Sequence, residues 1–263
     1  MVDFENKLRY DVSDLRKLML LLRSPGGCPW DAEQTHESIR RNMLEEAYEA
    51  VEAIDSGDTG DMIEELGDVL MQVMFHADIA QADGRFDLDD IADATCKKLI
   101  FRHPHVFGEL RAEDGASSLV FWEEMKRKEK NQETVADAMN GVAKSLPELW
   151  RAEKVQKKAA KVGFDWPDYT GAVDALISET DELLDAIKSG QRIEEELGDI
   201  IFSAVNIARF FDIDPERALR SASDKFISRF ARLEKQAAAQ GLRLEDMPLE
   251  EMEDIYTQVK LEE

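Results

Sequence analysis

The chain is poor in basic residues and in cysteine. Its 263 residues carry 33 Lys and Arg against 57 Asp and Glu, a formal net charge of −24. Such a chain offers no broad basic surface to a phosphate backbone or an anionic membrane, so we expect no nucleic-acid polymer as a partner. The 2 cysteines, Cys28 and Cys96, lack a CxxC spacing and predict no disulfide framework, which fits a reducing compartment.

Long apolar runs are also missing. Nothing approaches the roughly 20 apolar residues that span a bilayer. The first ten residues contain charges rather than the apolar run of a signal peptide. Strand-like alternation is scarce as well, which predicts an all-α fold. We therefore expect a cytoplasmic, all-α protein without a membrane partner.

What the chain does contain is one acidic motif written twice. Glu64-Glu65-Leu66-Gly67-Asp68 returns as Glu195-Glu196-Leu197-Gly198-Asp199. Each copy follows a second acidic cluster, with Glu45, Glu46 and Glu49 before the first and Glu179 and Glu182 before the second. A repeat of this kind predicts two tandem helical-bundle domains: residues 1–130, a linker at 131–147, and residues 148–263.

Apolar periodicity and turn residues place the first motif on helices. Apolar residues at three- and four-residue steps predict a helix over 4–23, followed by a loop over 28–36. Helices over 37–55 and 61–82 then carry the acidic clusters, and Ser56-Gly57-Asp58 separates them. Gly67 and Gly198 stand inside helical patterns, where Gly costs about 1 kcal/mol relative to Ala, so we expect close packing at both positions.

Carboxylates three residues apart lie on one helix face. Glu46 with Glu49, and Glu65 with Asp68, would therefore meet across two antiparallel helices. Four carboxylates repel one another unless a cation lies between them, and oxygen-only ligands favour Mg²⁺ or Mn²⁺ over zinc. A single acidic pair is ordinarily solvated surface. Because the pattern occurs twice, the metal-site interpretation is the stronger one.

Cations and aromatic residues repeat in the same order. Lys98 and Arg102 are four residues apart in the first half, as are Lys225 and Arg229 in the second. The aromatic–Lys pairs are Trp122 with Lys126, and Tyr256 with Lys260. Cations at this spacing ordinarily lie on a solvated helix face, and the aromatic residues are ordinarily anchors in the core. Opposite a metal–carboxylate cluster, they would instead bind phosphate oxygens and stack a base.

The histidines favour structural roles. His76 has no second His at a metal-ligand spacing, so a core or rim position is the better interpretation. His103 and His105 flank a proline that forces a turn, and neither Cys nor further His completes a zinc set.

These residues resemble the MazG nucleoside triphosphate pyrophosphohydrolases in their two-domain form. The family's acidic signature is similar to Glu45-Glu46-x-x-Glu49 followed by Glu65-x-x-Asp68. The segments 27–31, 102–108 and 162–167 also resemble that family, so the resemblance covers nearly the whole chain. It implies an all-α fold, Mg²⁺ dependence, a homodimer, and hydrolysis of NTPs or dNTPs to the monophosphate and pyrophosphate.

Position by position, the resemblance assigns site residues in both halves. It implies metal binding by Glu179, Glu182, Glu196 and Asp199 in the second half and by Glu46, Glu49, Glu65 and Asp68 in the first. It implies nucleotide contacts for Lys225, Arg229, Tyr256 and Lys260, and for the matching Lys98, Arg102, Trp122 and Lys126. Glu179 or Glu182 is the candidate catalytic residue that orients or deprotonates water. The second motif departs from the pattern in having Ser178 where the first has Glu45, and Tyr256 stands where members of the family often have Trp.

Two alternatives remain at this point. A dUTPase-like or phosphoribosyl-ATP pyrophosphohydrolase-like enzyme would share the metal site but recognise another base. A non-catalytic helical regulator would bind nucleotide or a partner protein and release no pyrophosphate.

Overall fold

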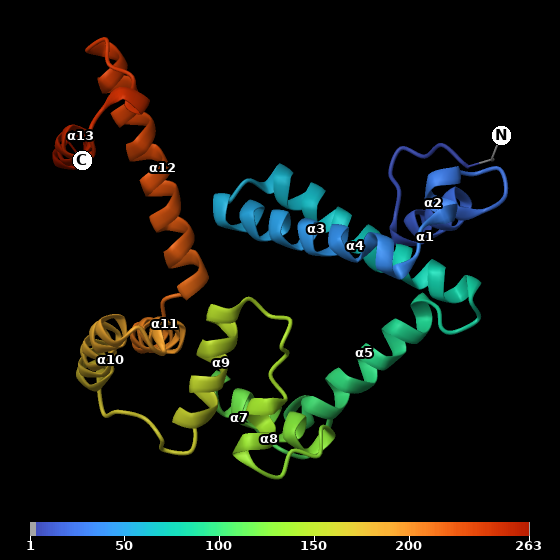
Figure 1. Ribbon diagram of the computed structural model, residues 1–263. Coiled ribbons are helices and arrows are strands. Elements are labelled where there is room, and N and C mark those ends of the chain that lie inside the picture. The colour runs from blue at the N-terminus through green and yellow to red at the C-terminus, as the bar shows by residue number, and fades with distance from the viewer. Residues whose placement is uncertain (1–3, 263) are drawn as a thin grey trace. The chain divides into compact units, whose positions relative to one another are not determined.

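The computed structural model describes residues 4–262, and the regular elements in that range are all helices (Figure 1). They fall into two compact units, residues 1–126 and 127–263, and each unit holds one copy of the acidic motif. This confirms the predicted all-α tandem architecture, while the domain boundaries at 130 and 148 stay a prediction.

The first unit contains α1 (Val12–Arg23), α2 (Pro29–Glu33), α3 (His36–Ser56), α4 (Thr59–Ala82), α5 (Leu88–Arg102), α6 (Pro104–Phe107) and most of α7 (Gly115–Glu129). The second contains α8 (Val135–Asn140), α9 (Glu148–Ala160), α10 (Tyr169–Ser189), α11 (Ile193–Phe210), α12 (Pro215–Ala239), the short 3₁₀ helix η1 (Leu244–Asp246) and α13 (Leu249–Leu261). Across residues 4–262, no helix is both long and apolar enough to cross a bilayer.

Side-chain caps decide where the first helices begin. The Asp11 carboxylate accepts from the backbone N–H of Asp14, and the Asp14 carboxylate accepts from that of Asp11, each at 3.0 Å. This capping box begins α1 at Val12, so the predicted start at residue 4 is wrong. The predicted loop over 28–36 is also wrong in part, because Pro29 at the first helical position begins the short helix α2.

Two antiparallel helix pairs carry the acidic motifs. In each pair the first helix ends at a glycine with left-handed backbone, Gly57 at φ 76° before α4 and Gly190 at φ 70° before α11. A residue with a Cβ adopts this conformation only at a cost. Figure 1 shows α3 beside α4 and α10 beside α11. The helices predicted over 37–55 and 61–82 are confirmed to within two residues at each end.

Each unit has its own apolar core. In the first, Met19 of α1, Ile39 of α3, and Met74 and Phe75 of α4 pack together, so one end of the α3–α4 pair is fixed by α1. In the second, Leu233 of α12 packs on Ile255 of α13. Burial of side chains of this size contributes about 1.5–3 kcal/mol each. The core of the first unit thus includes the helix pair with the acidic motif, whereas this core of the second unit lies between α12 and α13.

Asp214 links α9 to the start of α12. Its carboxylate accepts from Trp150 Nε1 of α9 at 2.8 Å and from the backbone N–H groups of Glu216 and Arg217. Burial acts to raise the pKa of Asp214, but these hydrogen bonds outweigh it and hold the pKa below its ordinary value. We predict that Asp214→Ala lowers the free energy of unfolding by about 1–2 kcal/mol at pH 7.

The difference should depend on pH. Because the folded pKa of Asp214 is depressed, its contribution is full above the unfolded pKa of about 3.9 and is lost as pH falls through the folded value. Urea unfolding at pH 7 and in the acid range measures this, with Asp224→Ala on the exposed face of the same helix as control. Equal destabilisation by the two variants would contradict the role of Asp214.

Candidate metal centres

The first acidic cluster forms where α3 faces α4. Carboxylate oxygens of Glu46 and Glu49 from α3 and of Glu65 from α4 all lie within 4.8 Å of one another. Gln72, which is buried one turn beyond Asp68, donates from Nε2 to Glu46 Oε1 at 3.5 Å. Asp68 is outside the group of three, although its charge acts on Glu46 and Glu65.

The second cluster forms in the same way between α10 and α11. Oxygens of Glu179, Glu196 and Asp199 lie within 4.8 Å of one another. Glu196 is only 3% exposed, and its Oε1 is 3.2 Å from Arg192 Nη1. Glu182 is exposed and outside the group of three, one turn along α10 from Glu179. The two halves therefore place corresponding carboxylates together, with one member of each predicted set of four at the edge.

Burial and mutual repulsion raise the pKa of several of these carboxyls. For Glu46 the causes are burial, then the charges of Asp68 and Glu49. For Glu65 they are burial, then Glu49 and Asp68. Burial also leads for Glu179, followed by Glu182, Asp199 and Glu196. Without a cation, the ionised forms of Glu46, Glu65 and Glu179 are thus disfavoured.

The side chains fit a hard divalent cation. Two ligands at 2.0–2.1 Å from one Mg²⁺ are at most about 4.2 Å apart, so small side-chain rotations would bring three oxygens within 4.8 Å onto one ion. All three donors are carboxylate oxygens in each cluster, which favours Mg²⁺ or Mn²⁺ over softer metals.

In the first unit the predicted cations lie apart from the carboxylates. Arg102, the last residue of α5, places its guanidinium 5.0 Å from the centre of the Trp122 ring and is only 8% exposed. The His103 ring meets the same indole edge-on at 4.9 Å. Figure 1 shows α5 leading away from the α3–α4 pair. Lys98 lies on α5 and Lys126 on α7, and neither helix belongs to the pair that carries the acidic cluster.

The second unit separates its groups in a similar way. Lys225 lies ten residues into α12, about 15 Å along the helix from its start at Pro215, with Arg229 one turn further. The Tyr256 ring of α13 is half-buried against Phe226, with ring centres 5.9 Å apart, and Lys260 Nζ lies 5.7 Å from that of Tyr256. The structure thus gathers the predicted nucleotide contacts on α12 and α13, away from the carboxylates of α10 and α11 (Figure 1).

Two neighbours of the clusters were not expected from the sequence. Arg192 precedes Glu196 by four residues, and Gln72 follows Asp68 by four, so helical spacing could have indicated both. The expected close packing at Gly67 and Gly198 is wrong for contacts within the chain, because a Cβ at either position meets nothing within 4 Å. His76 does not join a carboxylate cluster: its Nδ1 lies 2.7 Å from His36 Nδ1.

Comparison with known proteins follows the same division of the chain. The family model of the MazG nucleotide pyrophosphohydrolase domain matches residues 34–107 and again residues 169–232. These ranges hold the two helix pairs that carry the acidic clusters.

Several curated proteins are similar to this chain over nearly its full length. A protein of Escherichia coli K12 named nucleoside triphosphate pyrophosphohydrolase is 43% identical over 257 residues, covering 96% of this chain and 98% of its own. One of Thermotoga maritima named nucleoside triphosphate pyrophosphohydrolase/pyrophosphatase MazG is 42% identical over 247 residues, or 94% of each chain. The uncharacterized protein YabN of Bacillus subtilis is 43% identical over 260 residues, covering 97% of this chain and 53% of its own.

The raised pKa of Glu65 gives a stability prediction. A carboxyl group whose pKa is higher in the folded than in the unfolded protein lowers the stability of the protein as pH rises from the unfolded pKa toward the folded pKa. Glu65→Gln should therefore raise the melting temperature of the metal-free protein at pH 7, and the gain should vanish below the unfolded pKa of about 4.3.

Added Mg²⁺ should reverse the order of the two melting temperatures. It should raise the melting temperature of the wild type more than that of Glu65→Gln, because the variant has lost one ligand. Thermal unfolding in EDTA and in Mg²⁺ measures both effects, with the exposed neighbour Glu64→Gln as matched control. The same response to Mg²⁺ in Glu65→Gln and Glu64→Gln would contradict a metal centre here.

Proposed function

This chain belongs to the MazG nucleotide pyrophosphohydrolase family, and from that premise we propose how its two acidic clusters share the work. The chain is a hydrolase that splits nucleoside triphosphates into the monophosphate and pyrophosphate. We propose that the second unit carries out this reaction and that the first holds an accessory metal centre.

The surroundings of the clusters support this division. In the second unit Arg192 balances part of the charge on buried Glu196, whereas the matching position of the repeat in the first unit is Asp61. Lys225 is exposed on α12 and accessible to a phosphate group. The matching Lys98 of the first unit is exposed as well, but Arg102, which matches the half-buried Arg229, is buried against Trp122. Glu179, Glu196 and Asp199 would supply the metal ligands for the reaction, and the ion pair of buried Glu196 with Arg192 is the observation that carries the choice of the second unit.

The metal would be held by these three residues. When bound, Mg²⁺ neutralises triphosphate charge and lowers the pKa of a coordinated water. Mn²⁺ would suit the same oxygen donors. Glu46, Glu49 and Glu65 would hold the accessory ion in the first unit, with Asp68 at its edge.

Glu182 is the best-placed residue to position the attacking water. It lies one turn from Glu179 but outside the group of three, so its oxygens are not needed by the metal. The Ser178 hydroxyl donates to its Oε1 at 3.4 Å and helps to orient it. Glu182 would take the water proton as the new P–O bond forms and the bond to the pyrophosphate oxygen breaks. Glu179 would then act as ligand.

The remaining residues would bind the nucleotide. Lys225 and Arg229 would neutralise the leaving pyrophosphate, and the Tyr256 ring would stack the base, with Lys260 beside it. In the first unit the matching Lys98, Arg102, Trp122 and Lys126 stay predicted nucleotide contacts, although the buried stack of Arg102 on Trp122 favours a structural role for that pair.

A homodimer would bring the separated groups together. Apolar side chains are exposed along the three long helices of the second unit: Ile177, Leu184 and Ile187 on α10, Leu197 and Ile201 on α11, and Leu219, Phe226, Ile227 and Phe230 on α12. Residues 219, 226 and 230 follow seven- and four-residue steps, the spacing of a helix-packing seam. A second copy of α12 would cover such a surface, bring Lys225 and Arg229 to the carboxylates, and fill the open space beside Gly198.

Product analysis tests the division of work. We expect monophosphate and pyrophosphate from a panel of NTPs and dNTPs with Mg²⁺, about 100-fold or more slowly in Glu196→Gln and nearly unchanged in Glu65→Gln. Full activity of Glu196→Gln in a Glu65→Gln background would overturn the assignment. The panel also separates dUTPase-like and phosphoribosyl-ATP pyrophosphohydrolase-like specificity, and folded protein that releases no pyrophosphate would indicate a binding regulator.

Mixed subunits test the shared site. Glu196→Gln and Arg229→Ala chains, both in the Glu65→Gln background, should each be inactive alone. If carboxylates and cations come from different subunits, random dimers of the two regain about a quarter of the activity, because one site in each mixed dimer is intact. Light scattering confirms the dimers. No recovery in mixed dimers would place both sets of residues in one chain.

We further expect the protein in the cytoplasm.

A further inference from the structure

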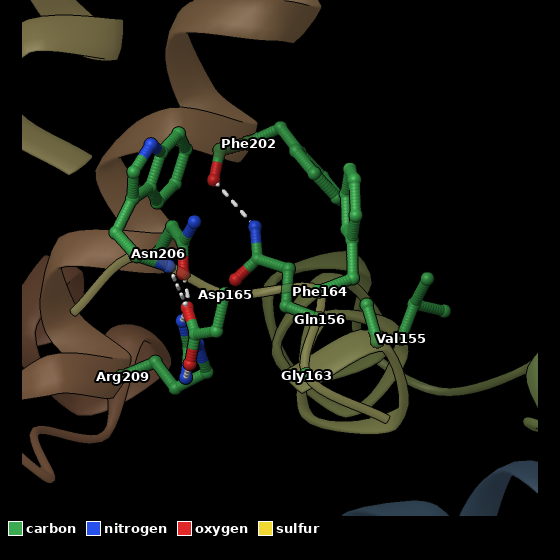
Figure 2. A pocket seen from close by; sticks show the side chains of 10 residues that line it. Val155, Gln156, Gly163, Phe164, Asp165, Phe202, Asn206 and Arg209 are labelled. Carbon is green, nitrogen blue, oxygen red and sulfur yellow. Dashed lines mark hydrogen bonds and ion pairs between the residues drawn. The ribbon is translucent and has the colours of Figure 1, made fainter. Parts of the chain in front are cut away.

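The second unit contains a cavity away from its acidic cluster. It measures about 370 Å³ and lies between α9, the segment 163–166 and α11 (Figure 2). Apolar atoms make up most of its lining, which includes Val155, Ala159, Phe164, Trp166 and Phe202. A volume of this size and an aromatic lining are typical of small-molecule sites.

Two aromatic rings border the cavity in different ways. Trp166 is seated against the first turn of α10, where a Cβ on Gly171 would come within 2.3 Å of the indole ring. Only glycine leaves room for the ring at that point. Phe164, by contrast, is 83% exposed next to Gly163, whose φ of +85° makes the turn that presents it. The cavity therefore has one fixed aromatic wall and one exposed aromatic rim.

The oxygen of a buried amide in the cavity lacks a hydrogen-bond donor. Gln156 of α9 is 6% exposed, and its Nε2 donates to the Phe202 carbonyl of α11 at 2.8 Å. That bond fixes the orientation of the amide and turns Oε1 toward the other lining residues, where it accepts no hydrogen bond from the described residues (Figure 2). A buried acceptor without a donor is unfavourable, and a ligand N–H would relieve it.

A second amide across the cavity complements the first. Arg209 Nε donates to Asn206 Oδ1 at 2.8 Å, so the Asn206 amide nitrogen is directed elsewhere and remains available as a donor. Asp165 pairs with both terminal nitrogens of Arg209, which neutralises the guanidinium. The polar groups left for a ligand are thus one acceptor and one donor, without a spare charge for a phosphate.

The first unit has no amide at the position that matches Asn206. Aligning the two acidic motifs places Phe75 opposite Asn206 and Met71 opposite Phe202. Phe75 is buried in the core of the first unit, with the Arg23 guanidinium 5.1 Å from its ring centre. The polar amide is therefore specific to the second unit, at a position that the first unit fills with an aromatic side chain.

We propose that this cavity is a second ligand site, which binds the adenine ring of a nucleoside without phosphates. The exocyclic amine would donate to Gln156 Oε1, an adjacent ring nitrogen would accept from Asn206 Nδ2, and the ring would lie against Trp166 and Phe164. The site is distinct from the metal centre, since Asn206 lies about 10 Å along α11 from Asp199.

Calorimetric titration of the full chain with adenosine in EDTA tests this directly. Adenosine should bind saturably, and Asn206→Phe, which introduces the residue of the first unit, should weaken binding at least tenfold. Gln156→Leu should do the same by removing the acceptor. Tyr256→Ala, in the proposed nucleotide contacts of the active site, should leave this binding unchanged. Loss of binding in Tyr256→Ala but not in Asn206→Phe would assign adenosine to the active site and overturn the proposal.

A ligand series tests the hydrogen bond without altering the protein. N6,N6-dimethyladenosine has no amino hydrogen, so it should bind the wild type at least tenfold more weakly than adenosine. Equal affinity for the two would overturn the proposal, as would no binding of adenosine at millimolar concentration, which is also the result if a second copy of the chain covers the cavity. None of these measurements depends on turnover. The adenosine site and the proposed hydrolysis are therefore tested independently, and either can be overturned without the other.

Discussion

Repulsion among carboxylates held between two facing helices is the constraint on which the rest of the structure depends. The helix pair α10–α11 brings Glu179, Glu196 and Asp199 within 4.8 Å of one another, although burial and the neighbouring carboxylates raise the pKa of Glu179. The left-handed glycine that ends the first helix of each pair sets which residues face each other. A cation between the two helices would offset this repulsion.

The two halves meet this constraint with different neighbours. In the first, the amide of Gln72 contacts Glu46, and the α4 face beyond it, including Met74 and Phe75, is packed into the core with α1. In the second, the guanidinium of Arg192 contacts Glu196, and the α11 face beyond the cluster borders a cavity. Both halves thus contain the helix pair, while the helix face beyond the cluster packs into a core in the first half and borders a cavity in the second.

Local patterns in the sequence predicted the parts of the site that depend on local geometry. The 3.6-residue period places Glu46 and Glu49 on one face, and the glycine turns return the next helix antiparallel, so the clusters could be predicted before any tertiary contact was known. The start of α1 could not be predicted from apolar spacing alone, because the capping box at Asp11 overrides the apolar pattern that begins before it. The unpartnered oxygen of Gln156 could not be predicted either, since it arises only when α9 packs against α11.

One helix connects the two sites of the second unit. Asp199, Phe202 and Asn206 follow steps of three and four residues, so they lie along a single face of α11. A cation at Asp199 and a ligand at Asn206 would therefore act on the same face of one rigid element, about two turns apart. A rotation of α11 that tightens one contact would alter the other, and a coupling between the two sites would be equal in both directions. In the first unit the matching face of α4 is packed into the core, so this arrangement is confined to the second unit.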